Sequence, residues 1–267
     1  MINPLNRDKL RSQFRNARPF PFIVIDNLLV PGAAEEVARA YPSFEQAGAQ
    51  GFMFNFVNEQ KKIQITDSSK FPQAVRQLND AISAPQFLAD LEYITGIPRL
   101  LADEQLVGGG MHLTGPGGRL DVHVDFNLIE DRKLFRRLNI LLYLNPVWQE
   151  SWGGQIELWD RDVKNRVHSC SPAINRCLIF ETSEFSYHGV GQVMGPPENV
   201  RQSFAAYYYT REPPPNWSGK YHSTIFRARP DERFRGLVQM PVEKIRRRIM
   251  DTVQHSKQRV KSWMGIS

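Results

Sequence analysis

Three side chains that can bind a metal lie on two predicted β-strands. His123 and Asp125 are two residues apart, and His188 follows 63 residues beyond Asp125. Alternate side chains of a strand share a face, so His123 and Asp125 point one way while Val122 and Val124 pack on the other side. A second strand can bring His188 against this pair. Two imidazoles and one carboxylate on one face of a metal leave three adjacent positions open, the arrangement of non-haem Fe(II) oxygenases.

Each of these residues also has an ordinary structural role open to it. His123 fits a core histidine, Asp125 a turn former and His188 a strand-end residue, and His-x-Asp pairs occur by accident in many chains. The surroundings favour the metal site. A Gly-Pro-Gly-Gly turn at residues 115–118 leads into the first strand, and the apolar residues 177–180 form a buried strand before His188. The combined pattern therefore predicts a metal with open positions, which serves substrate chemistry.

A cationic side chain is expected beside this site. Arg201 begins a further predicted strand, residues 203–209, whose alternating faces can place the guanidinium inside a barrel. A buried Arg needs an anion, and its planar fork suits a carboxylate. Ser203 shares its face as a weaker second contact. For Tyr143 and Asn139, which share one face of an intervening strand, both pocket lining and core packing are open, and core packing is the commoner role of a strand Tyr.

The ordered set of motifs resembles that of the 2-oxoglutarate and Fe(II)-dependent dioxygenases of the prolyl-hydroxylase type. The blocks that match, in chain order, are residues 122–125, 137–145, 152–159, 175–180, 188–190 and 201–205. They are similar to the His-x-Asp strand, the strand after it, the Gly-Gly strand start, the strand before the distal His, the distal His itself and the Arg strand. The resemblance covers about residues 107 to 210.

This resemblance implies Fe(II) as the metal, O2 as oxidant and 2-oxoglutarate as cosubstrate, chelated to the iron with its distal carboxylate on Arg201. The implied iron ligands and catalytic residues are His123, Asp125 and His188. The further cosubstrate contacts expected are Ser203 and Tyr143. The implied activity is hydroxylation of an unactivated C–H bond with release of succinate and CO2. A prolyl residue, a peptide or an amino acid is the first expectation for the substrate.

Two other functions remain open. Basic side chains near the metal pair would suit an anionic sugar or a lipid headgroup at a membrane surface; these side chains are Arg132, Lys133, Arg136 and Arg137. A function of another class is a non-catalytic, cupin-like binding module that has kept a metal, although the presence of Arg201 argues against it. Fold and cofactor are shared by enzymes with many substrates, so the substrate stays open at this point.

Two departures from the family pattern concern the cosubstrate side of the site. Many of these enzymes carry a Tyr about ten residues before the first His, whereas here that neighbourhood is residues 111–114, with His112 as a candidate contact behind the ligands. The interval between His188 and Arg201 is also lengthened by residues 194–199, so a longer turn must connect their strands. The other histidines are not expected to bind the metal.

The elements that must position these residues predict an α+β fold. Short strands separated by Gly and Pro turns over residues 107–210 indicate a double-stranded β-helix, the cupin-like jelly roll, as catalytic core. Residues 1–106 form a support region of the same domain. It comprises a strand at 21–29 and buttressing helices at 31–41, 72–83 and 85–95. The aromatic segment 51–58 has strand period and faces either substrate or, more commonly, core.

Composition agrees with one main domain. The 267 residues are 41% apolar, enough to bury a large core. Two cysteines, Cys170 and Cys177, cannot form a disulfide framework. The start lacks the apolar segment of a secretory signal, and no apolar run approaches membrane-spanning length. The expected location is therefore the cytoplasm, with contact at the inner face of the membrane as an option.

The segment 211–267 differs in charge from the rest. It holds 13 Lys and Arg against 5 Asp and Glu, a net charge of +8 in a chain whose total is +6. Apolar residues recur near helical spacing from Val242 to Met264, which predicts a basic amphipathic C-terminal helix. This helix could contact an anionic membrane surface, an acidic partner or nucleic acid, or only cover the barrel. Nucleic acid is not expected as a partner, because no nucleic-acid fold signature is present.

Overall fold

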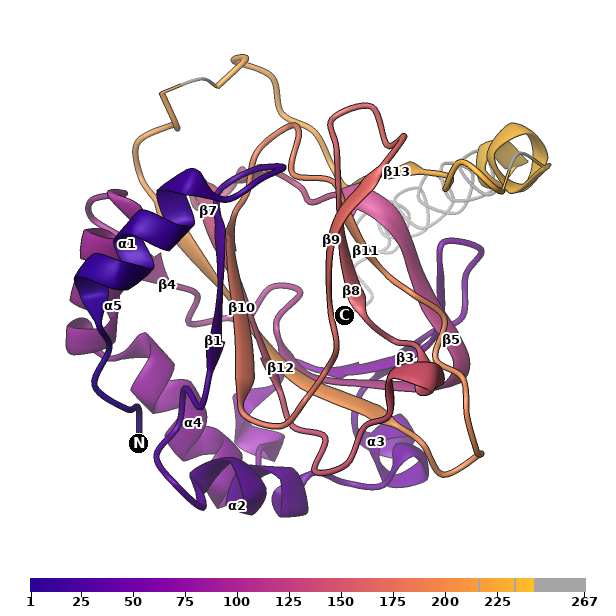
Figure 1. Cartoon of the computed structure of the whole chain (residues 1–267), viewed down its shortest axis with the longest axis horizontal. Helices are drawn as coiled ribbons and strands as arrows, with labels where there is room; N and C mark the ends of the chain where they lie inside the picture. The colour runs from indigo at the N-terminus through magenta and orange to yellow at the C-terminus, as the bar shows by residue number, and fades with distance from the viewer. Residues whose placement is uncertain (216, 233, 243–267) are drawn as a thin grey trace, which may run out of the picture.

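A long bent strand, β5 (Gly110–Val124), organises the fold. The computed structural model describes residues 1–215, 217–232 and 234–242. In it the start of β5 pairs with β12 (Arg201–Thr210), and its end pairs with β11 (His188–Val190). The Gly-Pro-Gly-Gly stretch lies between these two pairings. The strand therefore passes from one part of a curled antiparallel sheet to the other, as the jelly-roll prediction requires (Figure 1).

The strands form one antiparallel sheet in the order β1-β10-β7-β12-β5-β11-β8-β9. The bounds of the remaining strands on this path are β1 Phe22–Asp26, β7 Leu134–Tyr143, β8 Ile156–Trp159, β9 Arg166–Cys170 and β10 Arg176–Glu181. Shorter strands pair off this path: β2 Phe52–Phe54, β3 Glu59–Ile65, β4 Leu101–Ala102, β6 Leu128–Ile129 and β13 Ile225–Arg227. Apolar side chains of β7, β8 and β10, among them Tyr143, Leu158 and Phe180, form a cluster that joins the two parts of the sheet.

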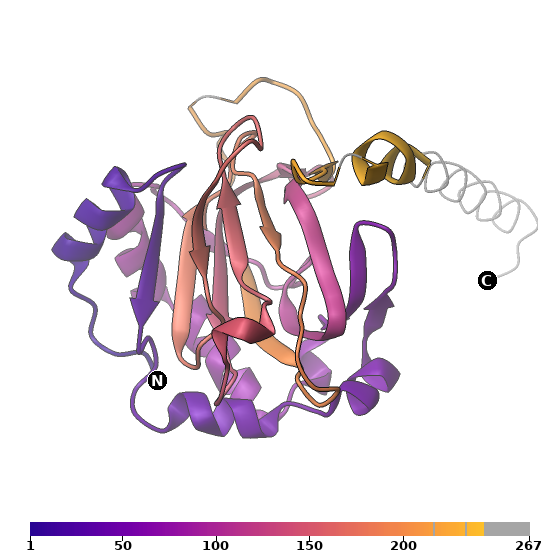
Figure 2. The same ribbon diagram turned by 45° about the vertical axis from the view of Figure 1, so that its right-hand side comes forward.

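Helices support one face of this sheet. Figures 1 and 2 show them, in indigo and purple, along one side of the strands and below them. They are α1 Arg7–Asn16, α2 Ala33–Ala40, α3 Phe44–Gln50, α4 Gln73–Ser83 and α5 Pro85–Thr95. Their buried residues join Leu138, Ile179 and Phe204 of the sheet in the largest apolar core. Short helical segments are η1 Ser68–Lys70, η2 Glu150–Trp152 and η3 Arg235–Gln239.

The predicted helices at 31–41, 72–83 and 85–95 are confirmed by α2, α4 and α5, and α5 ends where Gly96 adopts a φ of 75°. Helix α1 was not predicted, although Asn6 caps it by accepting a hydrogen bond from the backbone N–H of Lys9 at 3.2 Å. Pairing of β13 with β5 was not predicted either. Of the predicted basic amphipathic helix, residues 243–264 lie outside the described residues. No helix among the described residues is long and apolar enough to cross a bilayer.

Replacing Gly110, the first residue of β5, with alanine should destabilise the protein more than the same change at Gly32. Both have left-handed φ values, 89° for Gly110 and 81° for Gly32. A Cβ on Gly110 would lie 2.2 Å from the carbonyl oxygen of Ile65, whereas a Cβ on Gly32 would have no neighbouring atom within 4 Å. Gly32→Ala should lower the free energy of unfolding by about 1 kcal/mol and Gly110→Ala by about 3 kcal/mol or more. Chemical denaturation measures both, and equal losses would contradict the predicted clash.

Candidate metal centre

The three predicted metal-binding side chains meet where β5 and β11 pair. His123 stands directly opposite His188 in this pairing, and their ring centroids are 4.2 Å apart. Asp125 follows the end of β5, with its Oδ1 atom 3.4 Å from Nε2 of His123 and its Oδ2 atom 3.5 Å from Nε2 of His188. One ligand atom from each residue lies within 4.8 Å of the others. This spacing suits one metal ion.

Backbone carbonyls orient both imidazoles toward this point. Nδ1 of His123 donates to the carbonyl of Asp121, and Nδ1 of His188 donates to that of Ser186, each at 2.9 Å. Each ring therefore presents the lone pair of Nε2 to Asp125, the tautomer that metal binding requires. Burial, together with the nearby His123, lowers the pKa of His188 from 6.5 to about 4. His188 is thus uncharged at neutral pH and free to bind a cation.

Asp125 is held by two neighbours that engage its Oδ2 atom. The side-chain amide of Asn139 donates to Oδ2 at 2.7 Å, and Nη2 of Arg136 lies 3.4 Å from the same atom. Arg136 also donates from Nε to Oδ1 of Asn139 at 3.0 Å. Burial alone would raise the pKa of Asp125, but the charge of Arg136 holds it well below its usual value. The carboxylate is therefore ionised and fixed in direction.

A bulge in β7 explains why Arg136 faces this site. Tyr209 of β12 pairs with Arg136 and Tyr208 pairs with Leu138, so one residue of β7 is skipped. Simple alternation from Asn139 would have pointed residue 137 inward. Instead, Arg136 and Asn139 both line the cavity. The preference for core packing of Asn139 was therefore wrong.

The basic residues that suggested an anionic substrate are mostly engaged inside the protein. Arg132 pairs with Asp103 at 3.0 Å, and Arg136 pairs with Asp125. Arg137 is buried and donates to the hydroxyl of Thr210 at 3.3 Å. Of the four, only the side chain of Lys133 belongs to an exposed residue. These contacts remove the main observation that favoured an anionic substrate.

Arg201 and the triad line the same cavity, whose volume is about 290 Å³. Arg201 donates from Nε to the carbonyl of Gly154 at 2.8 Å and from Nη1 to the hydroxyl of Ser203 at 3.3 Å. Its Nη2 atom is buried and has no hydrogen-bond partner among the described residues. Such an orphaned donor calls for an anionic ligand. Tyr143 packs 5.0 Å from the guanidinium carbon but does not itself line the cavity.

Other cavity residues come from β5 and from the aromatic segment. His112 lies in the wall, where burial lowers its pKa well below the usual value and its Nε2 contacts the carbonyl of Gly108 at 3.1 Å. Phe54 also lines the cavity, while Phe52 and Met53 are 58% and 46% exposed. The preference for core packing of this segment was therefore wrong.

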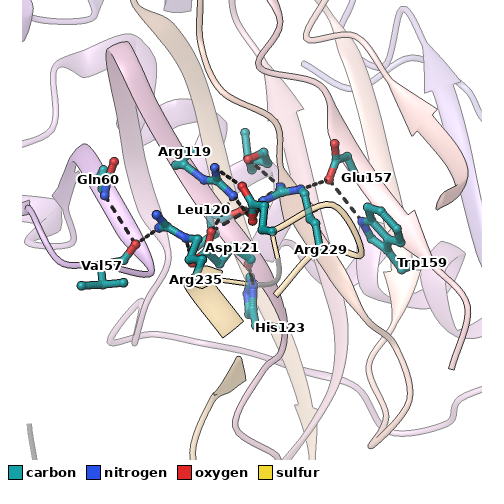
Figure 3. Close-up of polar contacts among 12 residues, drawn as sticks. Val57, Gln60, Arg119, Leu120, Asp121, His123, Glu157, Trp159, Arg229 and Arg235 are labelled. Carbon is teal, nitrogen blue, oxygen red and sulfur yellow. Dashed lines mark hydrogen bonds and ion pairs between the residues drawn. The ribbon is translucent and has the colours of Figure 1, made fainter. Parts of the chain in front are cut away.

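Two arginines from the basic segment brace the strands behind the metal centre (Figure 3). The carboxylate of Asp121 is fully buried, with Arg119 at 2.8 Å, Arg235 at 3.0 Å and Arg229 at 3.6 Å. Arg229 also donates from Nε to the carboxylate of Glu157 on β8 at 2.9 Å. Because the Asp121 carbonyl orients His123, this network fixes the backbone that aims a metal-binding ring. The sequence did not predict this network, since Arg229 and Arg235 lie more than a hundred residues from Asp121.

The comparisons with known proteins agree with this geometry. The family profile described as the 2OG-Fe(II) oxygenase superfamily matches residues 109–209, which carry the triad and Arg201. A stretch of 78 residues is 36% identical to the prolyl 3-hydroxylase OGFOD1 of Mus musculus. That stretch takes in 28% of this chain but only 14% of the mouse protein, so most of that relative has no counterpart in the match.

Two solved structures share the fold. A prolyl-4-hydroxylase of Pseudomonas putida has a TM-score of 0.52 at 17% identity, over 75% of this chain and 98% of that one. A prolyl hydroxylase of Trichoplax adhaerens, solved with a peptide of the hypoxia-inducible factor oxygen degradation domain, has a TM-score of 0.54 at 18% identity, over 76% and 90%. At such identities the likeness establishes the jelly-roll architecture.

Replacing Asn139 with alanine should weaken metal binding. The variant removes the hydrogen bond from the side-chain amide to Oδ2 of Asp125, so the carboxylate is no longer held in one direction. We expect the affinity for a divalent metal to fall by about 10- to 100-fold, with a loss of about 1–3 kcal/mol in stability because Nε of Arg136 loses its acceptor. Titration with Fe(II) or Co(II) measures this, with Asn165→Ala in an exposed turn as the control. Unchanged affinity in Asn139→Ala would contradict the role of this amide.

Acid should destabilise the metal-free protein through His188. The folded pKa of about 4 lies below the ordinary 6.5, so between these values the unfolded chain binds a proton that the folded chain does not. The contribution is complete above pH 6.5 and is lost as the pH falls to about 4. We expect a loss of about 3 kcal/mol, to which His112 adds in the same direction. Denaturant titrations across this range measure it, and a flat profile would contradict it.

Proposed function

We propose, from the match of residues 109–209 to the profile of the 2OG-Fe(II) oxygenase superfamily, that this chain is an Fe(II)- and 2-oxoglutarate-dependent hydroxylase. Its substrate would be a prolyl residue of a peptide or an amino acid. The observation that carries the proposal is one cavity that contains both the His123–Asp125–His188 cluster and the orphaned, buried guanidinium of Arg201. The first suits a metal with open positions, and the second suits the far carboxylate of a metal-bound keto acid.

The residues present fit both groups. His123, Asp125 and His188 would hold Fe(II), and Arg201 with Ser203 would hold 2-oxoglutarate. Four cationic side chains line the cavity, and three of them pair with carboxylates: Lys62 with Glu59, Arg119 with Asp121 and Arg136 with Asp125. The uncompensated charge of Arg201 therefore favours an anionic cosubstrate. When bound, Fe(II), 2-oxoglutarate and O2 supply the oxidative decarboxylation that gives succinate and CO2 and the oxidation of an unactivated C–H bond.

The protein's own part is to bind, to orient and to exclude water. Asn139 and Arg136 hold the carboxylate of Asp125, and backbone carbonyls hold the two imidazoles. Apolar rings shield the imidazoles, because Phe226 lies 5.4 Å from the ring of His123 and Phe180 lies 4.7 Å from that of His188. A site walled in this way lowers the local dielectric and strengthens the ion pairs that position the ligands.

A prolyl substrate is supported by the relatives, which include a prolyl 3-hydroxylase over a short stretch. The anionic sugar or lipid headgroup has less support, because most of the basic side chains that suggested it have internal partners. Contact of the C-terminal helix with a membrane, and a cytoplasmic location, stay predictions. A non-catalytic binding module has no use for the orphaned Nη2 of Arg201, and this disfavours it.

The proposed function is tested by incubating the protein with Fe(II), O2 and 2-oxoglutarate in the presence of short proline-containing peptides. We expect succinate release that depends on both Fe(II) and peptide, with one oxygen atom added to the peptide in its mass spectrum. Asp125→Ala is the inactive control. Absence of any 2-oxoglutarate turnover by a folded, iron-loaded protein, with and without peptides, would contradict the proposal.

Arg201→Ala should weaken 2-oxoglutarate binding and leave the metal in place. The variant removes a charged donor pair from a buried site, worth roughly 10- to 100-fold in affinity for a carboxylate. Arg201→Lys keeps the charge without the planar fork and should recover only part of the loss. The KM for 2-oxoglutarate and the bound iron content measure these effects. An unchanged KM in Arg201→Ala would mean that another cation holds the distal carboxylate.

A further inference from the structure

A second cavity, of about 370 Å³, adjoins the metal centre. Asp125, Phe126 and Arg136 line both this cavity and the first one. The rest of its wall comes from Phe20 and Pro21 just before β1, from Asn127, from the end of β10 and the loop that follows it (residues 181–185), and from Pro214, Pro215 and Trp217. A group bound in the second cavity would therefore lie beside a predicted metal ligand. None of the residues beyond the shared three has a part in binding iron or 2-oxoglutarate as proposed above.

The two cavities have opposite charge. The first carries an excess of cationic side chains, whereas the second is lined by three carboxylates and one guanidinium. Asp125 pairs with that guanidinium, Arg136, which leaves Glu181 and Glu184 to set the local charge. Neither has a cation within ion-pair distance among the described residues, although Glu184 accepts a hydrogen bond from the hydroxyl of Ser218. The second cavity is thus negative where the first is positive.

The burial of these carboxylates makes a cation favourable. Glu181 is half-buried at the end of β10, and burial raises its pKa while the charge of Arg137 partly opposes this rise. Glu184 is also half-buried. A carboxylate that has lost water without gaining a counter-ion is stabilised by any cation that can reach it. An anionic ligand would be repelled.

Aromatic rings form much of the remaining wall: Phe20, Phe126, Phe185 and Trp217. Faces of aromatic rings attract ammonium and guanidinium groups, most strongly where water is excluded. Two of these rings already bind arginines of the chain itself. The guanidinium carbon of Arg161 lies 3.6 Å from the ring centre of Phe185, and that of Arg136 lies 4.6 Å from that of Phe126. A ligand with a cation at the end of an apolar stem would match both the rings and the carboxylates.

We propose that this second cavity binds the side chain of a lysine or arginine in the substrate peptide, close in sequence to the residue that is hydroxylated. That the bound side chain belongs to a substrate rests on the proposed function. The cation site itself depends only on residues of the chain. Because Asp125 borders both cavities, a basic side chain in the second one would hold its neighbour in the peptide at the metal. Selection for a basic residue would then be built into the wall of the site.

The test is calorimetric titration, without O2, of the protein loaded with Fe(II) and 2-oxoglutarate. The probes are three peptides of the sequence Gly-Xaa-Pro-Gly-Xaa-Gly in which Xaa is arginine, citrulline or norleucine, and n-butylguanidinium as a free cation. We expect the arginine peptide to bind about tenfold more tightly than the citrulline peptide, which has almost the same shape without the charge. Equal affinities of these two peptides would overturn the proposal. Equal affinity of n-butylguanidinium and the arginine peptide would also overturn it, in favour of a small organic cation.

Variants connect the preference to this cavity. Glu181→Gln and Glu184→Gln each remove a charge at nearly constant shape and should reduce the preference for arginine over citrulline to about threefold or less. Glu36→Gln, on an exposed part of α2, is the matched control and should leave the preference intact. Thermal unfolding of all variants verifies that they fold. A full preference in both cavity variants would overturn the assignment of the site.

The same titration on metal-free protein separates this inference from the proposed function. A preference for arginine in the metal-free protein, together with no turnover of 2-oxoglutarate by the iron-loaded protein, would uphold the cation site and reject the hydroxylase. Turnover of 2-oxoglutarate together with equal binding of arginine and citrulline peptides would uphold the hydroxylase and reject the cation site.

Discussion

The pairing of His123 with His188 across β5 and β11 is the constraint on which the rest of the site depends. Backbone hydrogen bonds of the ladder set the separation of the two imidazoles, and β5 then carries Asp125 to the same point. This requires β5 to leave its pairing with β12 and bend, and the glycines of residues 115–118 occupy the bend. A metal centre formed in this way is fixed by the sheet itself and needs little help from loops.

The compensation of buried charges is the second feature that shapes the site. Arginines compensate each buried carboxylate near the centre: Arg136 at Asp125, and Arg119, Arg229 and Arg235 at Asp121. Removing one partner of such a pair leaves an uncompensated charge, so these groups hold one another in a single arrangement. Three charged groups beside the metal centre are exceptions among the described residues. The guanidinium of Arg201 has no anion within ion-pair distance, and Glu181 and Glu184 in the neighbouring cavity have no cation within it, so all three are suited to receive ligands.

Local pattern was sufficient for the part of the site that obeys strand alternation. The His-x-Asp spacing, the apolar strand before His188 and the position of Arg201 could all be read along the chain, as could helices α4 and α5 from their Pro and Gly boundaries. The bulge in β7 shifts that alternation by one residue and has no sequence signature of its own, so the contact of Arg136 with Asp125 was not predicted. Arg229 and Arg235 each contact Asp121 from more than a hundred residues away, which no local pattern encodes.

The central claim, that one cavity holds Fe(II) together with 2-oxoglutarate, is tested most directly by adding Fe(II) and then 2-oxoglutarate to the wild-type protein without O2 and recording the visible spectrum. Chelation of Fe(II) by a keto acid gives a weak charge-transfer band. The account predicts that this band grows with added 2-oxoglutarate and saturates at one equivalent per chain. A folded, iron-loaded protein that develops no such band would contradict it.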